Sequence, residues 1–158
     1  KNHPETLMLH VSGRANYDDL KKRFDERKLN GYDNLQLVAY LFDMPEKMAA
    51  ADFVICRSGA TTLSELAILG KPSILVPSPN VTDDQQTKNA RLLADGKAAL
   101  LLREEELTPG RLESEVKKLL SDRAELAEMG KKAAGFAVED TEEKIVGMIA
   151  ELVKNRRK

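Results

Sequence analysis

Short apolar runs alternate with charged, amphipathic stretches along most of this chain. The runs are four or five residues long, are bounded by polar or turn-forming residues, and lie at 7–11, 35–39, 53–56, 73–76 and 98–102. Runs of this length between turn signals are typical of buried β-strands. The stretches between them carry apolar residues at helical spacing, such as Leu20 and Phe24 within the charged segment 18–28. The pattern therefore predicts strands that alternate with helices.

Three consecutive helices are expected after the last strand. Thr108 and Pro109 open the first, the second covers 123–136, and Thr141 begins the third. Since strands that alternate with helices form parallel sheets covered on both faces, the expected fold class is α/β.

The expected architecture is a doubly wound parallel sheet of the Rossmann-like type, with residues 1–158 forming one domain. Such folds usually carry a glycine-rich phosphate loop after their first strand, but the chain contains no G-x-G-x-x-G motif. Two explanations stay open: the fold does without this loop, or the chain has lost its first strand–helix unit.

Residues 51–90 are the most informative stretch, because two strand-to-helix connections follow each other there. The strand at 53–56 leads through Ser58 and Gly59 to a helix expected near Thr62, and the strand at 73–76 leads through a polar loop to another helix. The carboxyl ends of parallel strands meet at one edge of a sheet, where open α/β folds bind ligands. We therefore expect these two loops to form a crevice.

The first connection, RSGATT at 57–62, has two possible interpretations. The free N–H groups of a helix start suit a phosphate, Gly59 would let the backbone come close, and the hydroxyls of Ser58, Thr61 and Thr62 would add donors. Alternatively, Thr62 and Glu65 form an ordinary capping box. Glu65 then either caps the helix or accepts hydrogen bonds from the two hydroxyls of a ribose.

The second connection is also ambiguous by itself. Gln85, Gln86 and Asn89 could present amide donors and acceptors to a polyol. Alternatively, Asp83 or Asp84 caps a helix whose polar first turn simply faces solvent. Taken together, two neighbouring polar helix starts favour a ligand that carries both phosphate and sugar.

Composition and charge narrow the classes of function. The chain is 42% hydrophobic and 32% charged, which suits a globular domain, and its net charge of −1 argues against a nucleic-acid partner. No segment approaches the ~18 apolar residues of a membrane-spanning helix. The one cysteine, Cys56, lies in an apolar strand and is expected to be a buried structural residue. His3 and His10 lack partners at ligand spacing, so no metal site is expected.

Three motifs in this order closely resemble the MurG family of bacterial N-acetylglucosaminyltransferases. They are RSGATTLSE at 57–65, the Pro-Ser-Pro turn at 77–79, and DQQ-x-x-NA at 84–90, and the resemblance extends from about Leu7 to Leu152. It implies a GT-B fold of two Rossmann-like domains that face each other across a cleft. This chain would be the C-terminal half, which binds the sugar donor.

The resemblance also implies roles for individual residues. The backbone at Leu41 would read the uracil edge, and Ala60, Thr61 and Thr62 would approach the diphosphate. Glu65 would hold the ribose hydroxyls. The N-acetylglucosamine hydroxyls would be addressed by three amides, those of Gln85, Gln86 and Asn89.

The reaction that the resemblance implies is the conversion of lipid I to lipid II in peptidoglycan synthesis, a pathway tied to cell shape and division. The donor is UDP-N-acetylglucosamine (UDP-GlcNAc), no cofactor is involved, and the transfer inverts the anomeric carbon by direct displacement. Charge that grows on the leaving diphosphate would be met by a helix N-terminus rather than by a required metal. The enzyme would work as a peripheral protein on the cytoplasmic face of the bacterial membrane.

Two parts of the family pattern are missing from this sequence. One is the first strand with its Gly-Gly-Ser-type loop, and the other is the acceptor-binding N-terminal domain with the general base and the membrane-contacting face. We therefore expect the chain to be a fragment without transferase activity of its own. Two alternatives stay open: another GT-B nucleotide-sugar enzyme, such as an epimerase or a glycolipid synthase, and a stand-alone binding subunit that needs a partner chain.

Overall fold

A computed structural model describes residues 5–138 and 140–156 of the chain. By its internal contacts the chain divides into two compact units, Lys1–Met44 and Pro45–Lys158, and each is described by itself. The prediction of a single domain stays a prediction.

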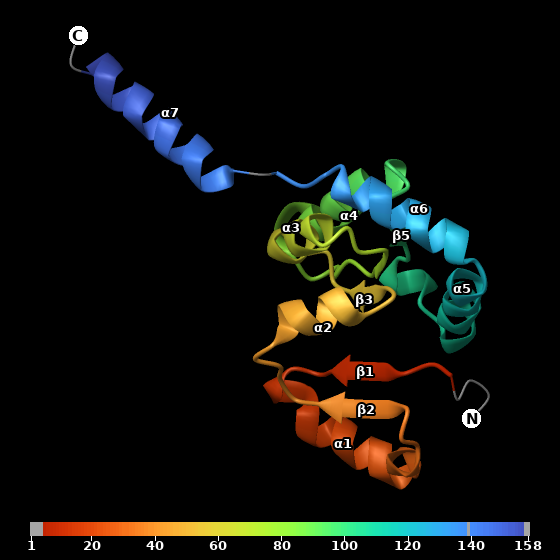
Figure 1. Ribbon diagram of the computed structural model, residues 1–158. Helices are drawn as coiled ribbons and strands as arrows, with labels where there is room; N and C mark the ends of the chain where they lie inside the picture. Colours follow the sequence, from red (N-terminus) through yellow and green to blue (C-terminus); the bar gives the residue numbers. More distant parts are fainter. Residues whose placement is uncertain (1–4, 139, 157–158) are drawn as a thin grey trace. The chain divides into compact units, whose positions relative to one another are not determined.

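The first unit is one strand–helix–strand unit (Figure 1). β1 (Met8–Val11) and β2 (Leu35–Val38) are parallel, with Met8 opposite Leu35, and α1 (Tyr17–Glu26) lies between them in sequence. The short 3-10 turns η1 (Arg14–Asn16) and η2 (Leu29–Gly31) flank α1. Gly13, between β1 and η1, has φ 75° and ψ 151°, a conformation that is open almost only to glycine.

None of the described residues of this first unit is fully buried. Leu7 is 65% exposed and Met8 is 48% exposed, although the run 7–11 was expected to be a buried strand. That expectation is wrong for this end of β1, because a two-stranded sheet with one helix offers too little apolar surface to cover it.

The second unit contains a three-stranded parallel sheet in the order β3-β4-β5. The strands are β3 (Val54–Cys56), β4 (Ser73–Leu75) and β5 (Leu100–Leu101), and the helices between them are α3 (Ala60–Ile68) and α4 (Gln85–Asp95). The helix α2 (Met44–Ala50) precedes β3, and the 3-10 turns η3 (Thr82–Asp84) and η4 (Glu104–Glu106) precede α4 and follow β5. All of β4 is buried because it is the central strand.

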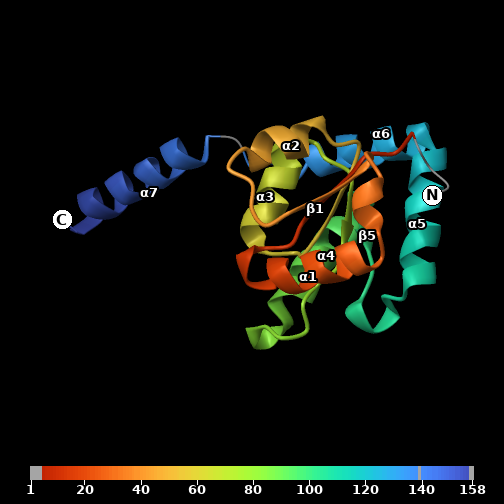
Figure 2. The same ribbon diagram turned by 90° about the horizontal axis from the view of Figure 1, so that it is seen from below.

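Two further helices complete the core of this unit. α5 (Pro109–Ser121) and α6 (Arg123–Ala134) lie side by side and are joined at Asp122 (Figures 1 and 2). As predicted, Thr108 caps α5, and its hydroxyl accepts a hydrogen bond from the N–H of Arg111 at 3.2 Å. The apolar core that α5 and α6 cover has six buried members: Ile74, Val76, Leu102, Leu119, Leu126 and Met129.

The last predicted helix is also present as α7 (Thr141–Arg156). Its apolar side chains follow helical spacing but remain about half exposed or more; they are Ile145, Val146, Met148, Ile149, Leu152 and Val153.

Candidate functional site

The two strand-to-helix connections of residues 51–90 leave the carboxyl ends of neighbouring parallel strands. β3 and β4 pair directly, with Cys56 opposite Leu75. The loop 57–59 follows β3 and leads to α3, and the loop 76–84 follows β4 and leads to α4. Because the two strands are parallel neighbours, both loops lie at the same edge of the sheet, which is the arrangement that the expected crevice requires.

The helix α3 begins at Ala60, two residues earlier than predicted, with Gly59 as its N-cap. No side chain caps it, because Gly59 has none and Thr62 already lies in the first turn. The capping-box interpretation of Thr62 and Glu65 is thus wrong. The first N–H groups of an α-helix have no acceptor within the helix, so this N-terminus can accept an anion.

Open space lies in front of this helix start. A Cβ atom added at Gly59 would have no heavy atom within 4 Å. Ala60 and Thr61 are exposed and Thr62 is half-buried. A ligand could therefore approach the backbone at these positions without displacing protein atoms.

The side chain of Ser58 does not face a ligand, although it was expected to donate to one. It is fully buried, and its hydroxyl donates to the backbone carbonyl of Gln86 at 2.7 Å. Because a hydroxyl has one proton to donate, this hydrogen bond takes the donor that was expected to face a ligand. Ser58 thus connects the loop after β3 to the first turn of α4.

The helix α4 begins at Gln85 without a side-chain cap. Asp83 and Asp84 both adopt left-handed backbone conformations, with φ 54° and 52°, and neither caps the helix as the alternative interpretation required. Gln85 is exposed, whereas Gln86 and Asn89 are half-buried.

Gln86 and Asn89 reach back to the two loops. The side-chain oxygen Oε1 of Gln86 accepts a hydrogen bond from the N–H of Ser78 at 2.9 Å. The side-chain nitrogen Nδ2 of Asn89 donates to the carbonyl oxygen of Ser58 at 3.2 Å. The structure thus brings the loops and the first two turns of α4 together through side-chain hydrogen bonds.

Arg57 is a residue of this region to which sequence reasoning assigned no role. Its Nη1 atom lies 3.2 Å from the carbonyl oxygens of both Val76 and Pro77, and 2.5 Å from a carboxylate oxygen of Glu104. It therefore ties the end of β3 to the end of β4 and to η4. Its sequence signals were its place directly after an apolar strand and at the start of the motif 57–65, and neither identifies its partners.

Glu65 is half-buried on α3, close to Cys56 of β3. Burial, and secondarily the negative charge of Glu65, raise the pKa of Cys56 from 9.0 to about 11. The thiol is therefore neutral near pH 7, as expected of a structural cysteine.

Leu41 belongs to the first unit and follows β2. It is half-buried between two exposed aromatic residues, Tyr40 and Phe42, whose ring centroids lie 5.1 Å apart at an interplanar angle of 73°. The guanidinium carbon of Arg14 lies 5.0 Å from the Tyr40 ring centroid.

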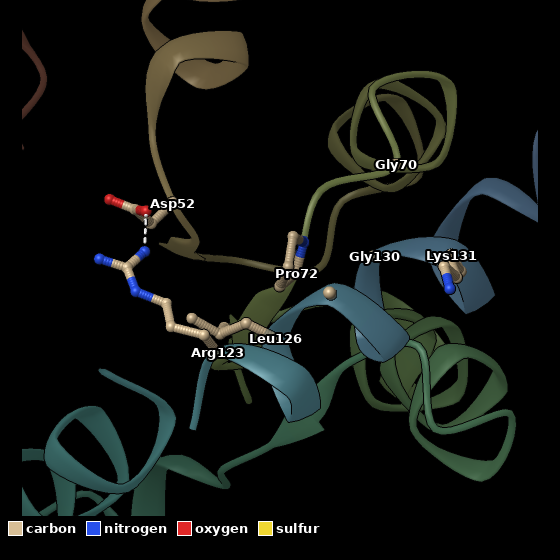
Figure 3. Close-up of a pocket in the computed structure, with 8 residues that line it drawn as sticks. Asp52, Gly70, Pro72, Arg123, Leu126, Gly130 and Lys131 are labelled. Carbon is tan, nitrogen blue, oxygen red and sulfur yellow. Dashed lines mark hydrogen bonds and ion pairs between the residues drawn. The ribbon is translucent and has the colours of Figure 1, made fainter. Parts of the chain in front are cut away.

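A separate hollow of about 500 Å³ lies at the other end of the strands, and Figure 3 shows its lining. Asp52 precedes β3 and Pro72 precedes β4, so this hollow opens at the amino ends of the strands. An ion pair between Asp52 and Arg123 lies at its edge. None of the site residues predicted from the sequence lines this hollow.

The described residues include neither a metal-binding cluster nor a membrane-spanning helix. Within 5–138 and 140–156, no three His, Cys, Asp or Glu side chains gather in a way that could hold a metal ion; His3 lies outside these residues. None of the helices in the same ranges combines the length and the apolar character that crossing a membrane requires.

The chain is similar to proteins of known family. A family model described as "Glycosyltransferase family 28 C-terminal domain" matches residues 1–145. A UDP-N-acetylglucosamine–N-acetylmuramyl-(pentapeptide) pyrophosphoryl-undecaprenol N-acetylglucosamine transferase from Acetivibrio thermocellus is 40% identical over 159 residues, which cover 99% of this chain and 42% of that protein. The chain thus spans about two fifths of the length of this curated relative.

Solved structures show the same fold. The crystal structure of Acinetobacter baumannii MurG matches with 31% identity and a TM-score of 0.77, over 90% of this chain and 42% of that one. Spinosyn forosaminyltransferase SpnP, 18% identical with a TM-score of 0.59 over 98% of this chain and 46% of that one, shows likeness of fold alone.

These matches confirm two expectations from the sequence, the resemblance to MurG and the α/β fold of one half of a GT-B glycosyltransferase. The family model covers nearly all of the chain, including both loops and the helices that follow them. The chain therefore belongs to the family of glycosyltransferase family 28 C-terminal domains.

Proposed function

We propose that this chain is the donor-binding part of an N-acetylglucosaminyltransferase and that its two loops bind UDP-GlcNAc. One observation carries the proposal: the N-terminus of α3, which no side chain caps, is joined to the first turn of α4 by the hydrogen bond from Ser58 to Gln86. A helix start attracts phosphate, and the amides of α4 suit a sugar.

In this proposal the diphosphate lies against the backbone of Gly59, Ala60, Thr61 and Thr62. The exposed hydroxyl of Thr61 adds a donor there. The partial positive charge of the helix start would stabilise the charge that develops on the leaving UDP.

The other parts of the donor are assigned to three further sets of residues. Glu65 accepts hydrogen bonds from the two ribose hydroxyls, since a carboxylate beside a phosphate would be repelled by it. Gln85, Gln86 and Asn89 face the N-acetylglucosamine. For the uracil edge, the likeness to MurG alone suggests the backbone at Leu41, a residue of the first unit.

For the complete enzyme we propose the reaction after which the Acetivibrio thermocellus relative is named, the transfer of N-acetylglucosamine to lipid I. A hydroxyl of lipid I attacks the anomeric carbon and gives its proton to a general base. The bond from that carbon to the diphosphate oxygen breaks, UDP leaves from the opposite side, and the configuration inverts. The acceptor, the general base and contact with the cytoplasmic face of the membrane belong to the part of the enzyme that this chain does not include. By itself this chain binds the donor and does not transfer the sugar.

Isothermal titration calorimetry on the complete natural protein that carries this chain tests the proposal. UDP, UDP-GlcNAc and UDP-glucose are titrated against the parent and against Glu65→Ala. Since Glu65 is assigned to the ribose, which all three ligands share, Glu65→Ala should weaken all three alike, by about tenfold or more.

Glu128→Ala serves as the control, because Glu128 is an exposed carboxylate on α6 that lies outside the two loops. This variant should bind like the parent. Parent protein that binds neither UDP nor UDP-GlcNAc would refute the proposed function, and unchanged binding in Glu65→Ala would refute the ribose assignment.

A further inference from the structure

The hollow at the amino ends of β3 and β4 has two walls. One wall is a single stripe of α6, whose members recur at the helical spacing i, i+3, i+4, i+7 and i+8. They are Arg123, Leu126, Ala127, Gly130 and Lys131. The other wall consists of Asp52, which precedes β3, and of Gly70 and Pro72, which precede β4. The hollow therefore lies between one helix face and the segments that enter two neighbouring strands.

Two glycines leave space in this hollow. A Cβ atom at Gly130 would lie 2.6 Å from the carbonyl oxygen of Gly70, so α6 meets the opposite wall backbone to backbone, with no side chain to fill the room beside the contact. Pro72, Leu126 and Ala127 supply apolar surface there. The volume of about 500 Å³ is within the usual range of small-molecule sites, about 300–1,000 Å³.

The three charged side chains of the lining do not balance one another. Asp52 and Arg123 form an ion pair. The ammonium group of Lys131 has no ion pair or hydrogen bond within the described part of the chain, whereas that of its neighbour Lys132 lies 3.7 Å from a carboxylate oxygen of Glu128. The lining thus keeps one uncompensated positive charge, at Lys131.

This charge lies at one end of the apolar surface. Arg123 and Lys131 are eight residues apart on α6, which corresponds to about 12 Å along the helix axis. Figure 3 shows Pro72 and Gly130 between these two cations. A molecule in the hollow therefore meets an apolar middle, a neutralised ion pair at one end and a free ammonium group at the other.

We infer that this hollow is a binding site for a small molecule that combines an apolar body with one carboxylate. The body lies on Pro72, Leu126 and Ala127, and the carboxylate pairs with Lys131. A single negative charge fits one free ammonium group, whereas a phosphate monoester carries about −1.5 to −2 and would also be repelled by Asp52. The site lies at the opposite ends of β3 and β4 from the two loops to which we assign the donor.

Ligand-observed NMR titration of the complete natural protein tests this inference with two probes of the same shape. The probe 4-phenylbutyrate carries a carboxylate, and 4-phenylbutanol carries a hydroxyl in its place. The carboxylate probe should bind with a dissociation constant on the order of 1 mM, as expected of so small a molecule. It should bind about threefold tighter than the alcohol, since an ion pair at an exposed lysine adds little more.

The location of the site is tested by filling the hollow. Ala127→Leu places a larger side chain in it and should weaken both probes by about tenfold or more, because the apolar surface is then covered. Ala124→Leu is the matched control: it adds the same side chain to α6 at an exposed position that does not line the hollow. This variant should bind both probes like the parent.

The charge assignment is tested at Lys131. Lys131→Gln should weaken 4-phenylbutyrate by about threefold and leave 4-phenylbutanol unchanged, because only the ion pair is lost. Lys132→Gln removes a neighbouring cation that is already paired with Glu128, so this control should keep the preference for the carboxylate.

Three results would overturn the inference. They are a parent protein that does not bind 4-phenylbutyrate, an Ala127→Leu variant that binds it like the parent, and a Lys131→Gln variant that still prefers the carboxylate to the alcohol. None of these measurements uses a uridine nucleotide, so their outcome is independent of the proposed function. Thermal unfolding of each variant checks that it is folded.

Discussion

The carboxylate of Glu65 acts on the thiol of Cys56. Glu65 lies on α3 and Cys56 ends β3, and the negative charge of Glu65 adds to the effect of burial in raising the pKa of Cys56 to about 11. Glu65 lies in the second turn of α3, the helix that the loop 57–59 connects to the carboxyl end of β3. The thiol can report on the residue assigned to the ribose.

Replacing Glu65 by Gln should lower the pKa of Cys56. The variant removes the nearby negative charge that disfavours the thiolate, but burial, the larger cause, remains, so the pKa should stay above its ordinary value. The rate at which iodoacetamide alkylates this only cysteine of the chain, measured against pH, gives the pKa. Glu128→Gln should leave the alkylation profile unchanged, and an unchanged profile in Glu65→Gln would contradict the proximity.

The raised pKa of Cys56 also predicts a loss of stability at high pH. The folded chain holds the thiol proton more tightly than the unfolded chain, so the stabilisation is complete below about pH 9 and is lost as the pH rises toward 11. Urea unfolding at pH 8 and pH 11 gives the free energy of unfolding of the parent and of Cys56→Ala. Since all other groups titrate equally in both proteins, the difference between their losses isolates the contribution of the Cys56 thiol. The parent should lose more stability between the two pH values than Cys56→Ala does, and equal losses would refute the prediction.

Much of the fold could be predicted because local signals agreed with it. The five apolar runs, the Thr108-Pro109 start of α5 and the helical spacing in 141–152 all correspond to observed elements. The start of α3 could not be placed, because Thr62 and Glu65 match a capping box while the backbone of Gly59 already begins the helix. A pattern of residue types does not reveal which backbone N–H a side chain reaches.

The candidate site was predictable in its residue types but not in its hydrogen bonds. The motifs placed Ser58, Gln86 and Asn89 together, yet nothing in them indicated that the Ser58 hydroxyl would face Gln86 rather than a ligand. Ser58 is 28 residues from Gln86 and 31 residues from Asn89 in sequence. The pairing of β3 with β4 brings these distant residues together.

Two fully buried serines should respond oppositely to the same substitution. Ser58 donates at 2.7 Å, whereas the hydroxyl of Ser73 has no partner within the described part of the chain. Ser58→Ala removes a hydrogen bond and should lower the free energy of unfolding by about 1 kcal/mol, whereas Ser73→Ala removes an unsatisfied polar group and should raise it by a similar amount. Urea denaturation measures both, and a destabilised Ser73→Ala would indicate a partner for that hydroxyl.

Gly130 of α6 leaves no room for a side chain, because the backbone that follows α3 lies against it. A Cβ atom at this position would lie 2.6 Å from the carbonyl oxygen of Gly70, a backbone atom that cannot rotate away. Gly130→Ala should therefore lower the free energy of unfolding by about 1–3 kcal/mol, the usual range for overpacking. Thermal and urea unfolding measure the loss.

Gly110 provides the matched control, since it is also helical, lies in α5 and has no heavy atom within 4 Å of an added Cβ. Gly110→Ala should raise the free energy of unfolding by about 0.5–1 kcal/mol, because alanine loses less backbone entropy on folding. Opposite signs for the two variants would locate the effect at the contact between Gly130 and Gly70. Equal gains in both would mean that α6 can move away from Gly70 at little cost, which would refute the close packing of these two helices.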